Sequence, residues 1–129
     1  MSELARARYL NLATFRRDGR AVETPVWFAE SDGRLYAFSE GRAGKVKRLR
    51  NSPRSRVAAC DVRGRLRGPW QDASTRVVSD PAIVERAYAS LRAKYGLQMR
   101  LADGLSRLSG RFAKRAMLEI TPAGAASPD

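Results

Sequence analysis

A short segment in the middle of the chain carries the residues best suited to bind a phosphate group. Gly41 and Gly44 precede Lys45, which falls in the first turn of a predicted short helix. N–H groups at a helix N-terminus are free and partly positive, and glycine lets an anion come close to them. Arg48 lies one turn after Lys45 on the same side. The segment predicts either a phosphate site or a solvent-exposed basic helix.

The same segment is not the phosphate-binding loop of nucleotide hydrolases. That loop has four residues between its glycines and a Ser or Thr directly after its lysine. Here two residues separate Gly41 from Gly44, and Val46 follows Lys45. The sequence therefore excludes that class and leaves a looser phosphate site.

Basic residues are concentrated around this segment. The chain has 129 residues and a net charge of +12, from 25 basic and 13 acidic residues. Positions 40 to 67 hold ten of the basic residues and only two acidic ones. The ten are Arg42, Lys45, Lys47, Arg48, Arg50, Arg54, Arg56, Arg63, Arg65 and Arg67. Such a concentration indicates a nucleic acid, a phosphate or a polycarboxylate as partner, unless arginine simply replaces lysine on a solvated face.

Two absences exclude several catalytic classes. The chain has no histidine, so Ser-His-Asp and Cys-His catalysis and His-ligated metal sites are excluded. Its single cysteine, Cys60, allows neither an intrachain disulfide nor a thiolate metal cluster. Asp72 and Glu23 are isolated carboxylates. We therefore predict no metal site and assign no catalytic residue.

Two tryptophans, Trp27 and Trp70, are able to stack on a planar ring or a base. The alternative is a structural role inside the core, which is the commoner one for tryptophan. A leucine stripe from Leu97 to Leu108 predicts a core or dimer contact.

The elements that must position these residues are mostly strands. Asp-Gly turns at 18–19 and 32–33 predict a meander of three strands, over residues 9–15, 21–29 and 34–39. Pro25 lies inside the second strand and cannot donate to a ladder, so we expect a bulge or an unpaired position there. Further strands are expected over 56–61, 71–78 and 113–121, and helices over 43–51, 81–95 and 97–108.

This order predicts a mainly β protein with helices, built as a small antiparallel six-stranded barrel. We expect one domain over residues 1–121 and a flexible tail over 122–129. The N-terminus has no apolar stretch of signal-peptide length, and no apolar run approaches the length of a membrane span. A cytoplasmic protein without membrane association is therefore expected.

Four segments together resemble the pyridoxamine 5'-phosphate oxidase-like superfamily, and most closely its branch that depends on the deazaflavin coenzyme F420. The segments are YLNLATFRRDG (9–19), ETPVWF (23–28), GKVKRLRNSP (44–53), and KYG (94–96) with RAMLEITP (115–122). The resemblance covers nearly the whole chain, and it rests on the order and spacing of the segments. It implies an FMN-binding split-barrel fold and a homodimer with two cofactor sites at the subunit interface.

The resemblance also implies roles for particular residues. The family's phosphate-binding lysine corresponds to Lys45, and a Ser or Thr six residues before it, here Ser39, contacts the cofactor. The backbone of the second strand runs beside the tricyclic ring, which gives Pro25 a reason to interrupt the ladder. The implied cofactor-binding residues are Thr24, Pro25, Val26, Trp27, Phe38, Ser39, Lys45, Lys47 and Arg50.

Two features favour coenzyme F420 over FMN. The flavin-binding branch often carries a basic residue where Glu23 stands in this chain. F420 bears a phosphodiester and a polyglutamate tail, which a basic groove including Lys47 and Arg50 would attract. The expected function is hydride transfer from reduced F420 to an unsaturated small organic substrate. The alternatives are an FMN-dependent oxidase or flavin reductase of the same fold, a basic nucleic-acid-binding module, or a cofactor-binding protein without turnover.

Overall fold

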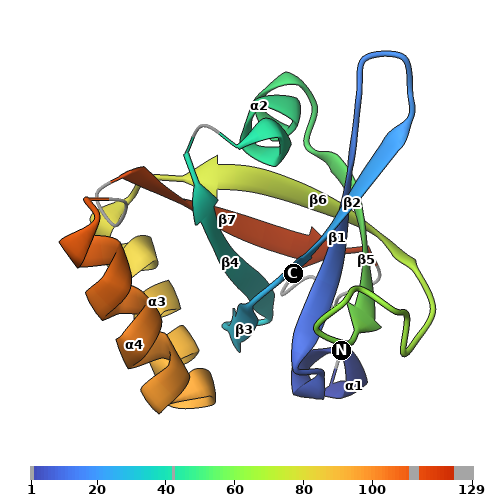
Figure 1. The fold of residues 1–129 in the computed structure, drawn as a ribbon. Helices are drawn as coiled ribbons and strands as arrows, with labels where there is room; N and C mark the ends of the chain where they lie inside the picture. Colours follow the sequence, from blue (N-terminus) through green and yellow to red (C-terminus); the bar gives the residue numbers. More distant parts are fainter. Residues whose placement is uncertain (1, 42, 111–113, 124–129) are drawn as a thin grey trace.

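The computed structural model describes residues 2–41, 43–110 and 114–123. It contains a seven-stranded antiparallel sheet in the order β2-β1-β5-β6-β7-β4-β3 (Figure 1). The sheet curls into a half-barrel, which confirms the predicted fold class of an antiparallel split barrel with helices. Among the described residues, no helix is long and apolar enough to span a bilayer.

The sheet curls because one stretch of chain supplies both of its edges. β2 (Ala21–Val26) pairs with β1 (Tyr9–Phe15), and β3 (Phe28–Ser31) pairs with β4 (Arg34–Glu40). Only Trp27 separates β2 from β3. The single strand predicted over 21–29 is therefore two strands, because its two halves have partners at opposite ends of the sheet. The strand count is seven instead of six for this reason.

The break also lies elsewhere than predicted. Pro25 stays in β2, in register with Asn11 of β1. An edge strand tolerates proline because one side of its backbone needs no ladder partner. The ladder changes partner two residues later, at Trp27. The expectation of an interruption at Pro25 is therefore wrong in position.

The remaining strands and helices follow the predicted order, with small shifts at their ends. They are α2 (Gly44–Asn51), β5 (Arg54–Cys60), β6 (Gln71–Val78), α3 (Pro81–Tyr95), α4 (Leu97–Leu108) and β7 (Arg115–Pro122). A short helix, α1 (Ser2–Arg6), was not predicted, because five residues are too few to show a helical apolar pattern. Pro122 is buried at the end of β7, and residues 124–129 of the predicted tail lie outside the described residues.

Two apolar clusters hold these elements together. The barrel interior contains Leu10, Leu12, Phe28, Leu35, Val46, Val57, Leu118 and Ile120, all fully buried. Val46 brings α2 onto this interior, so α2 is fixed at one end of the barrel (Figure 1). A second cluster packs α3 against β3 and β4 through Tyr88, Leu91 and Tyr95, with Met99 of α4. The helices α3 and α4 therefore form a separate layer beside the barrel.

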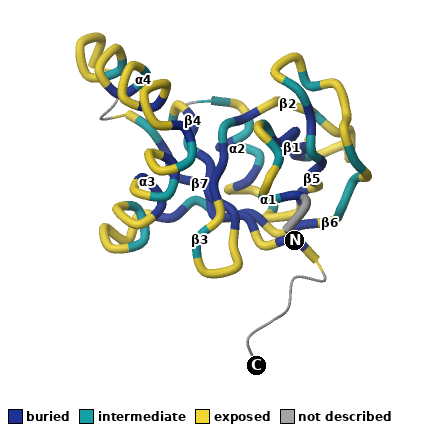
Figure 2. The backbone as a smooth tube through the Cα atoms, turned by 90° about the horizontal axis from the view of Figure 1, so that it is seen from below, coloured by how far each residue is buried: buried dark blue, intermediate teal, exposed yellow. Residues whose placement is uncertain are grey.

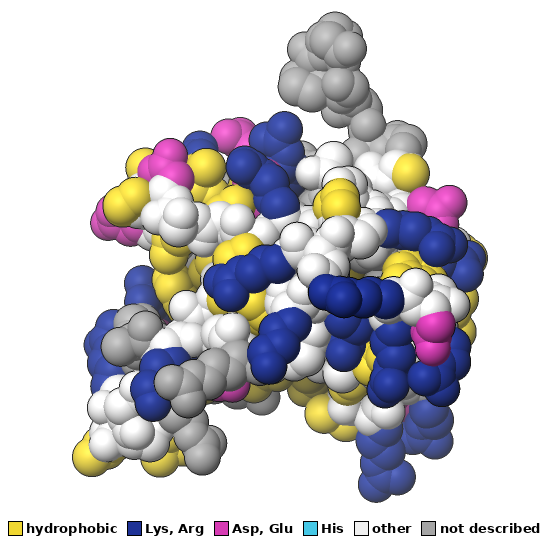
Figure 3. Space-filling view, turned by 90° about the horizontal axis from the view of Figure 1, so that it is seen from above, with side chains coloured by type: hydrophobic (Ala, Val, Ile, Leu, Met, Phe, Trp, Pro, Cys, Tyr) yellow, Lys and Arg dark blue, Asp and Glu magenta, His cyan; other side chains and the backbone are white. Residues whose placement is uncertain are grey.

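The α4 leucine stripe is not part of either cluster. Leu97, Leu101, Leu105 and Leu108 have exposed fractions of 60% to 88%, and Figure 2 shows the exposed side of this helix pointing away from the barrel. The prediction that this stripe packs into the core is therefore wrong for the single chain. Figure 3 shows that basic side chains also outnumber acidic ones over the face seen from above, so the surface field there is positive.

Candidate cofactor site

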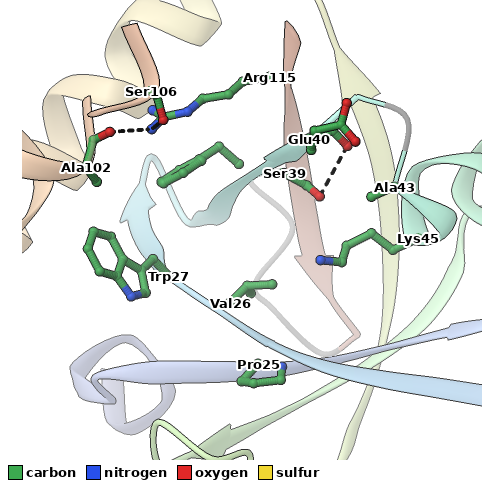
Figure 4. A pocket seen from close by; sticks show the side chains of 11 residues that line it. Pro25, Val26, Trp27, Ser39, Glu40, Ala43, Lys45, Ala102, Ser106 and Arg115 are labelled. Atoms are coloured by element: carbon green, nitrogen blue, oxygen red, sulfur yellow. Dashed lines mark hydrogen bonds between the residues drawn. The ribbon is translucent and has the colours of Figure 1, made fainter. Parts of the chain in front are cut away.

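A cleft of about 560 Å³ lies between the β2–β3 junction, the end of β4, the start of α2 and one side of α4 (Figure 4). Its size is in the range of small-molecule and cofactor sites. The described residues that line it are Pro25, Val26, Trp27, Phe38, Ser39, Glu40, Ala43, Lys45, Ala102, Ser106 and Arg115. Segments distant in the sequence thus meet at one concave surface.

Six of the nine predicted site residues line this cleft. They are Pro25, Val26, Trp27, Phe38, Ser39 and Lys45. The other three do not line it. Thr24 lies on β2 with a buried Oγ1 that has no hydrogen-bond partner among the described residues. Lys47 is exposed, and Arg50 lines a separate cavity of about 480 Å³ with Lys114.

Lys45 supplies positive charge to the cleft. Its amine points between Ser39 and Val26 (Figure 4), and no ion pair with a described carboxylate neutralises it. Burial lowers the pKa of Lys45, and repulsion from Arg48 lowers it further. No side chain caps the N-terminus of α2, where Lys45 stands. An anion bound here would stabilise the charged amine and meet the partly positive helix end.

Arg48 strengthens the positive potential beside Lys45. Its Nε donates a hydrogen bond of 2.7 Å to Thr14 Oγ1, which fixes the guanidinium against β1. Burial lowers the pKa of Arg48, and Arg16 lowers it further by repulsion. A Cβ at Gly44 would lie 2.7 Å from Arg48 Nη1. Glycine at this position therefore makes room for the arginine to fold back over the first turn of α2.

The opposite side of the cleft is aromatic. Trp27 lies across from Lys45 (Figure 4), and its indole stacks on Tyr95 with ring centroids 4.9 Å apart and planes inclined by 16°. Phe38 meets the indole edge-on at 6.4 Å. A planar ligand beside Trp27 would therefore find a flat apolar wall, with Lys45 on the other side of the same cleft.

The α4 side of the cleft is held by charged groups that the sequence reasoning missed. The Arg115 guanidinium donates to Asp103 Oδ1 at 2.9 Å and to Ser106 Oγ at 2.7 Å, and it lies 4.2 Å from the centre of the Phe38 ring. Asp103 also accepts from Arg92 at 3.3 Å. The only signal for this cluster was a lone Asp opposite the leucine stripe, and nothing local linked it to Arg115.

Chemically, the cleft can hold a planar ring against Trp27 and an anionic group against Lys45. No group of three or more His, Cys, Asp or Glu side chains in the described part of the chain is arranged to hold a metal ion. The charged side chains that line the cleft are Glu40, Lys45 and Arg115. The arrangement suits binding of a planar anionic ligand better than acid–base hydrolysis by paired carboxylates.

Comparisons with known proteins identify the family and the fold of the chain. The sequence profile of the family described as "Pyridoxamine 5'-phosphate oxidase" matches residues 1–127. No curated protein matches the chain significantly.

Solved structures share the fold over most of the chain. A conserved hypothetical protein of Mycobacterium tuberculosis, Rv2991, is 23% identical with a TM-score of 0.69, over 95% of this chain and 79% of that one. The haem storage protein HutZ of Vibrio cholerae is 17% identical with a TM-score of 0.70, over 94% and 86%. A protein described as an F420 reductase is 20% identical with a TM-score of 0.60, over 95% and 91%. Identities this low establish the fold alone.

Proposed function

Because the chain belongs to the pyridoxamine 5'-phosphate oxidase family, we propose that it is an oxidoreductase that binds the deazaflavin coenzyme F420 in the cleft between Trp27 and Lys45. It transfers a hydride from the reduced cofactor to an unsaturated small organic substrate. The observation that carries this proposal is one cleft that has an aromatic wall on one side and an unneutralised lysine on the other.

The residues of the cleft fit such a cofactor. Lys45 binds the phosphate, with the uncapped start of α2 behind it. Trp27 and Val26 flank the ring, and the Ser39 hydroxyl, 8% exposed as a residue, offers a hydrogen bond near Lys45. Bound here, F420 supplies the hydride, while the protein supplies position, charge and the exclusion of water.

Charge favours F420 over FMN. The tail of F420 adds carboxylates to its phosphodiester, and the surface outside the cleft offers exposed basic groups on α2, among them Lys47 and Arg50. The fold is shared both with a protein described as an F420 reductase and with one described as FAD-binding, so the choice between the cofactors rests on charge. The likeness to a haem storage protein is not carried over, because the chain lacks histidine, a common haem ligand.

We also propose that the working unit is a homodimer with its cofactor sites at the interface. The exposed leucine stripe of α4 supports a contact with a second protein chain. Four large apolar side chains along one side of a helix are costly to leave in water. The inner side of the same helix lines the cleft through Ala102 and Ser106. A partner on α4 would therefore lie next to the cofactor site.

The alternative is an FMN-dependent oxidase or flavin reductase, and the family description favours it over a nucleic-acid-binding module. Titration of the purified protein with F420 and with FMN separates the two cofactors. Quenching of tryptophan fluorescence reports binding beside Trp27, and a Trp70→Phe background isolates that signal. We expect F420 to quench and to bind more tightly than FMN.

Tight binding of FMN with no response to F420 would overturn the deazaflavin assignment, and binding of neither would overturn the cofactor role. A parallel titration with a short DNA duplex tests the nucleic-acid alternative, whose affinity would fall steeply with salt. Turnover is tested by mixing the protein with reduced F420 and a panel of unsaturated acceptors under anaerobic conditions. Return of the absorbance of oxidised F420 above the protein-free rate is expected.

A further inference from the structure

The bend between β2 and β3 is held by one side chain from a distant helix. Tyr95, the last residue of α3, places its hydroxyl oxygen 3.0 Å from the N–H of Phe28 and 3.0 Å from the carbonyl oxygen of the same residue. The hydroxyl is also 2.7 Å from the carbonyl oxygen of Arg8. It accepts from the Phe28 N–H, and its single proton serves the two carbonyls.

We infer that Tyr95 is the positioning residue for Trp27, and that it sets the aromatic wall of the cleft on which cofactor binding depends. Only the second part of this inference, the effect on cofactor binding, rests on the proposed function. Its first part, the placement of Trp27, stands on the contacts of Tyr95 alone.

The Tyr95 hydroxyl forms hydrogen bonds with the backbone at the point where the strand changes partner. Val26 still pairs with β1 and Phe28 already pairs with β4, so the backbone at Trp27 belongs to neither ladder. Buried backbone groups need a partner, and Tyr95 satisfies both polar groups of Phe28. Phe28 is fully buried. The hydroxyl therefore fixes the residue directly after Trp27.

The ring of Tyr95 fixes the indole itself. The rings of Tyr95 and Trp27 stack with their centroids 4.9 Å apart, and Phe38 contacts the indole edge-on. One tyrosine thus holds both the backbone after Trp27 and one face of the indole ring.

Tyr95 is itself held rigidly. It is 4% exposed, and α3 ends directly after it at Gly96, whose positive φ of 57° favours glycine. The neighbouring Lys94 donates to the carbonyl oxygen of Ala5 at 3.3 Å, and its amine lies 3.5 Å from the centre of the Phe28 ring. Burial raises the pKa of Tyr95 to about 12, so the hydroxyl keeps its proton at neutral pH.

The test compares Tyr95→Phe with Tyr36→Phe, both in the Trp70→Phe background. Tyr36 is a matched control, because it is also 4% exposed and its hydroxyl also makes a buried hydrogen bond, of 2.8 Å to Glu119. This bond goes to a side chain of β7, whereas the Tyr95 hydroxyl bonds to the backbone next to Trp27. Emission and acrylamide quenching of Trp27 are measured in the ligand-free protein. Dissociation constants are measured for F420 and FMN, and stability by urea unfolding.

We expect Tyr95→Phe to shift the Trp27 emission to longer wavelength, to increase its quenching, and to weaken binding of the preferred cofactor at least tenfold. Tyr36→Phe is expected to change both properties less than twofold while losing comparable stability. Unchanged emission and affinity in Tyr95→Phe would overturn the inference. So would equal effects of the two substitutions, because these would indicate a general loosening of the fold.

A double-mutant cycle provides a second measurement. If Tyr95 acts through Trp27, the loss of cofactor affinity caused by Tyr95→Phe becomes small when Trp27 is already phenylalanine. Affinities in this cycle are measured by equilibrium dialysis, because the Trp27→Phe proteins have no tryptophan beside the ligand to report binding. Equal losses in both backgrounds would contradict the inference. If the parent protein binds neither cofactor, the proposed function fails, while the ligand-free emission of Trp27 still decides the role of Tyr95.

Discussion

Asp103 on α4 and Arg115 at the start of β7 form an ion pair of 2.9 Å with 8% and 7% of their side chains exposed. Arg115 also donates to the carbonyl oxygen of Ala102 and to Ser106 Oγ. The pair therefore joins the inner side of α4 to the sheet. The α4 wall of the cleft therefore depends in part on this pair, beside the packing of Met99.

Removing the charge of Asp103 should be strongly destabilising. Asp103→Asn removes the anion that faces the buried Arg115 side chain, and breaking a buried pair costs about 3–5 kcal/mol. Urea unfolding measures the loss. The control is Asp18→Asn, which breaks an exposed pair with Arg20, 54% and 71% exposed, and should cost less than about 1 kcal/mol. Similar small losses in the two variants would contradict the structural role of Asp103.

Most of the elements were predictable from the sequence because their signals are local. The Asp-Gly turn at Gly19 and the Asp80-Pro81 helix start each depend on a few adjacent residues, and the structure has both where predicted. The division of the strand at Trp27 was not predictable, because it depends on which distant strand pairs with each half. Alternation of side chains continues through the bend and conceals it.

The site was predictable in part for the same reason. Lys45 and Trp27 carry recognisable chemistry in recognisable segments, and the structure brings both to one cleft. Arg115, Asp103 and Tyr95 act through contacts between distant segments. Nothing in the sequence around Asp103 shows that it faces inward, and the leucine stripe predicted as core or dimer contact is on the outside.

Two glycines should respond to alanine in opposite directions. A Cβ at Gly41 would lie 2.6 Å from the carbonyl oxygen of Lys114, so Gly41→Ala should destabilise the protein by about 1–3 kcal/mol. Gly104 lies inside α4 with no atom within 4 Å of an added Cβ. Gly104→Ala should stabilise by about 0.5–1 kcal/mol, because alanine loses less chain entropy in a helix. Thermal unfolding of both variants checks the signs, and equal signs would contradict the packing at Gly41.

The half-buried Lys94 should make stability depend on pH in the alkaline range. Burial lowers its pKa to about 8, and repulsion from Arg8 contributes. Between pH 8 and 10 the unfolded chain keeps a proton on this lysine that the folded chain has lost, so stability should rise with pH. Above about pH 10 the trend reverses, because the pKa values of Tyr36 and Tyr95 are raised to about 12 in the folded chain.

The measurement is the free energy of unfolding in urea at pH 7.5 and 9.5, for the parent and for Lys94→Met. Methionine keeps an apolar stem over the Phe28 ring and removes the titrating group. The rise between the two pH values should be smaller in Lys94→Met by on the order of 1 kcal/mol. Comparison of the two proteins removes the general effect of the falling net charge. Identical pH dependence would show that Lys94 is not buried as a cation.

Lys45 should contribute to cofactor affinity through its charge. Lys45→Ala removes a charge-assisted hydrogen bond to the cofactor phosphate, which is worth about 1.5–3 kcal/mol, or about 10- to 150-fold in the dissociation constant. Fluorescence titration with F420 and FMN measures the change. Lys47→Ala is the matched control in the FMN titration, because it removes the same charge from an exposed position of the same helix, outside the cleft, and FMN lacks the tail that Lys47 is proposed to attract. An exposed lysine acts mainly through the long-range field, so we expect its effect to be less than threefold and to disappear at high salt. Equal losses in the two variants would mean that α2 attracts the ligand only by its overall charge, and that Lys45 does not bind the phosphate directly.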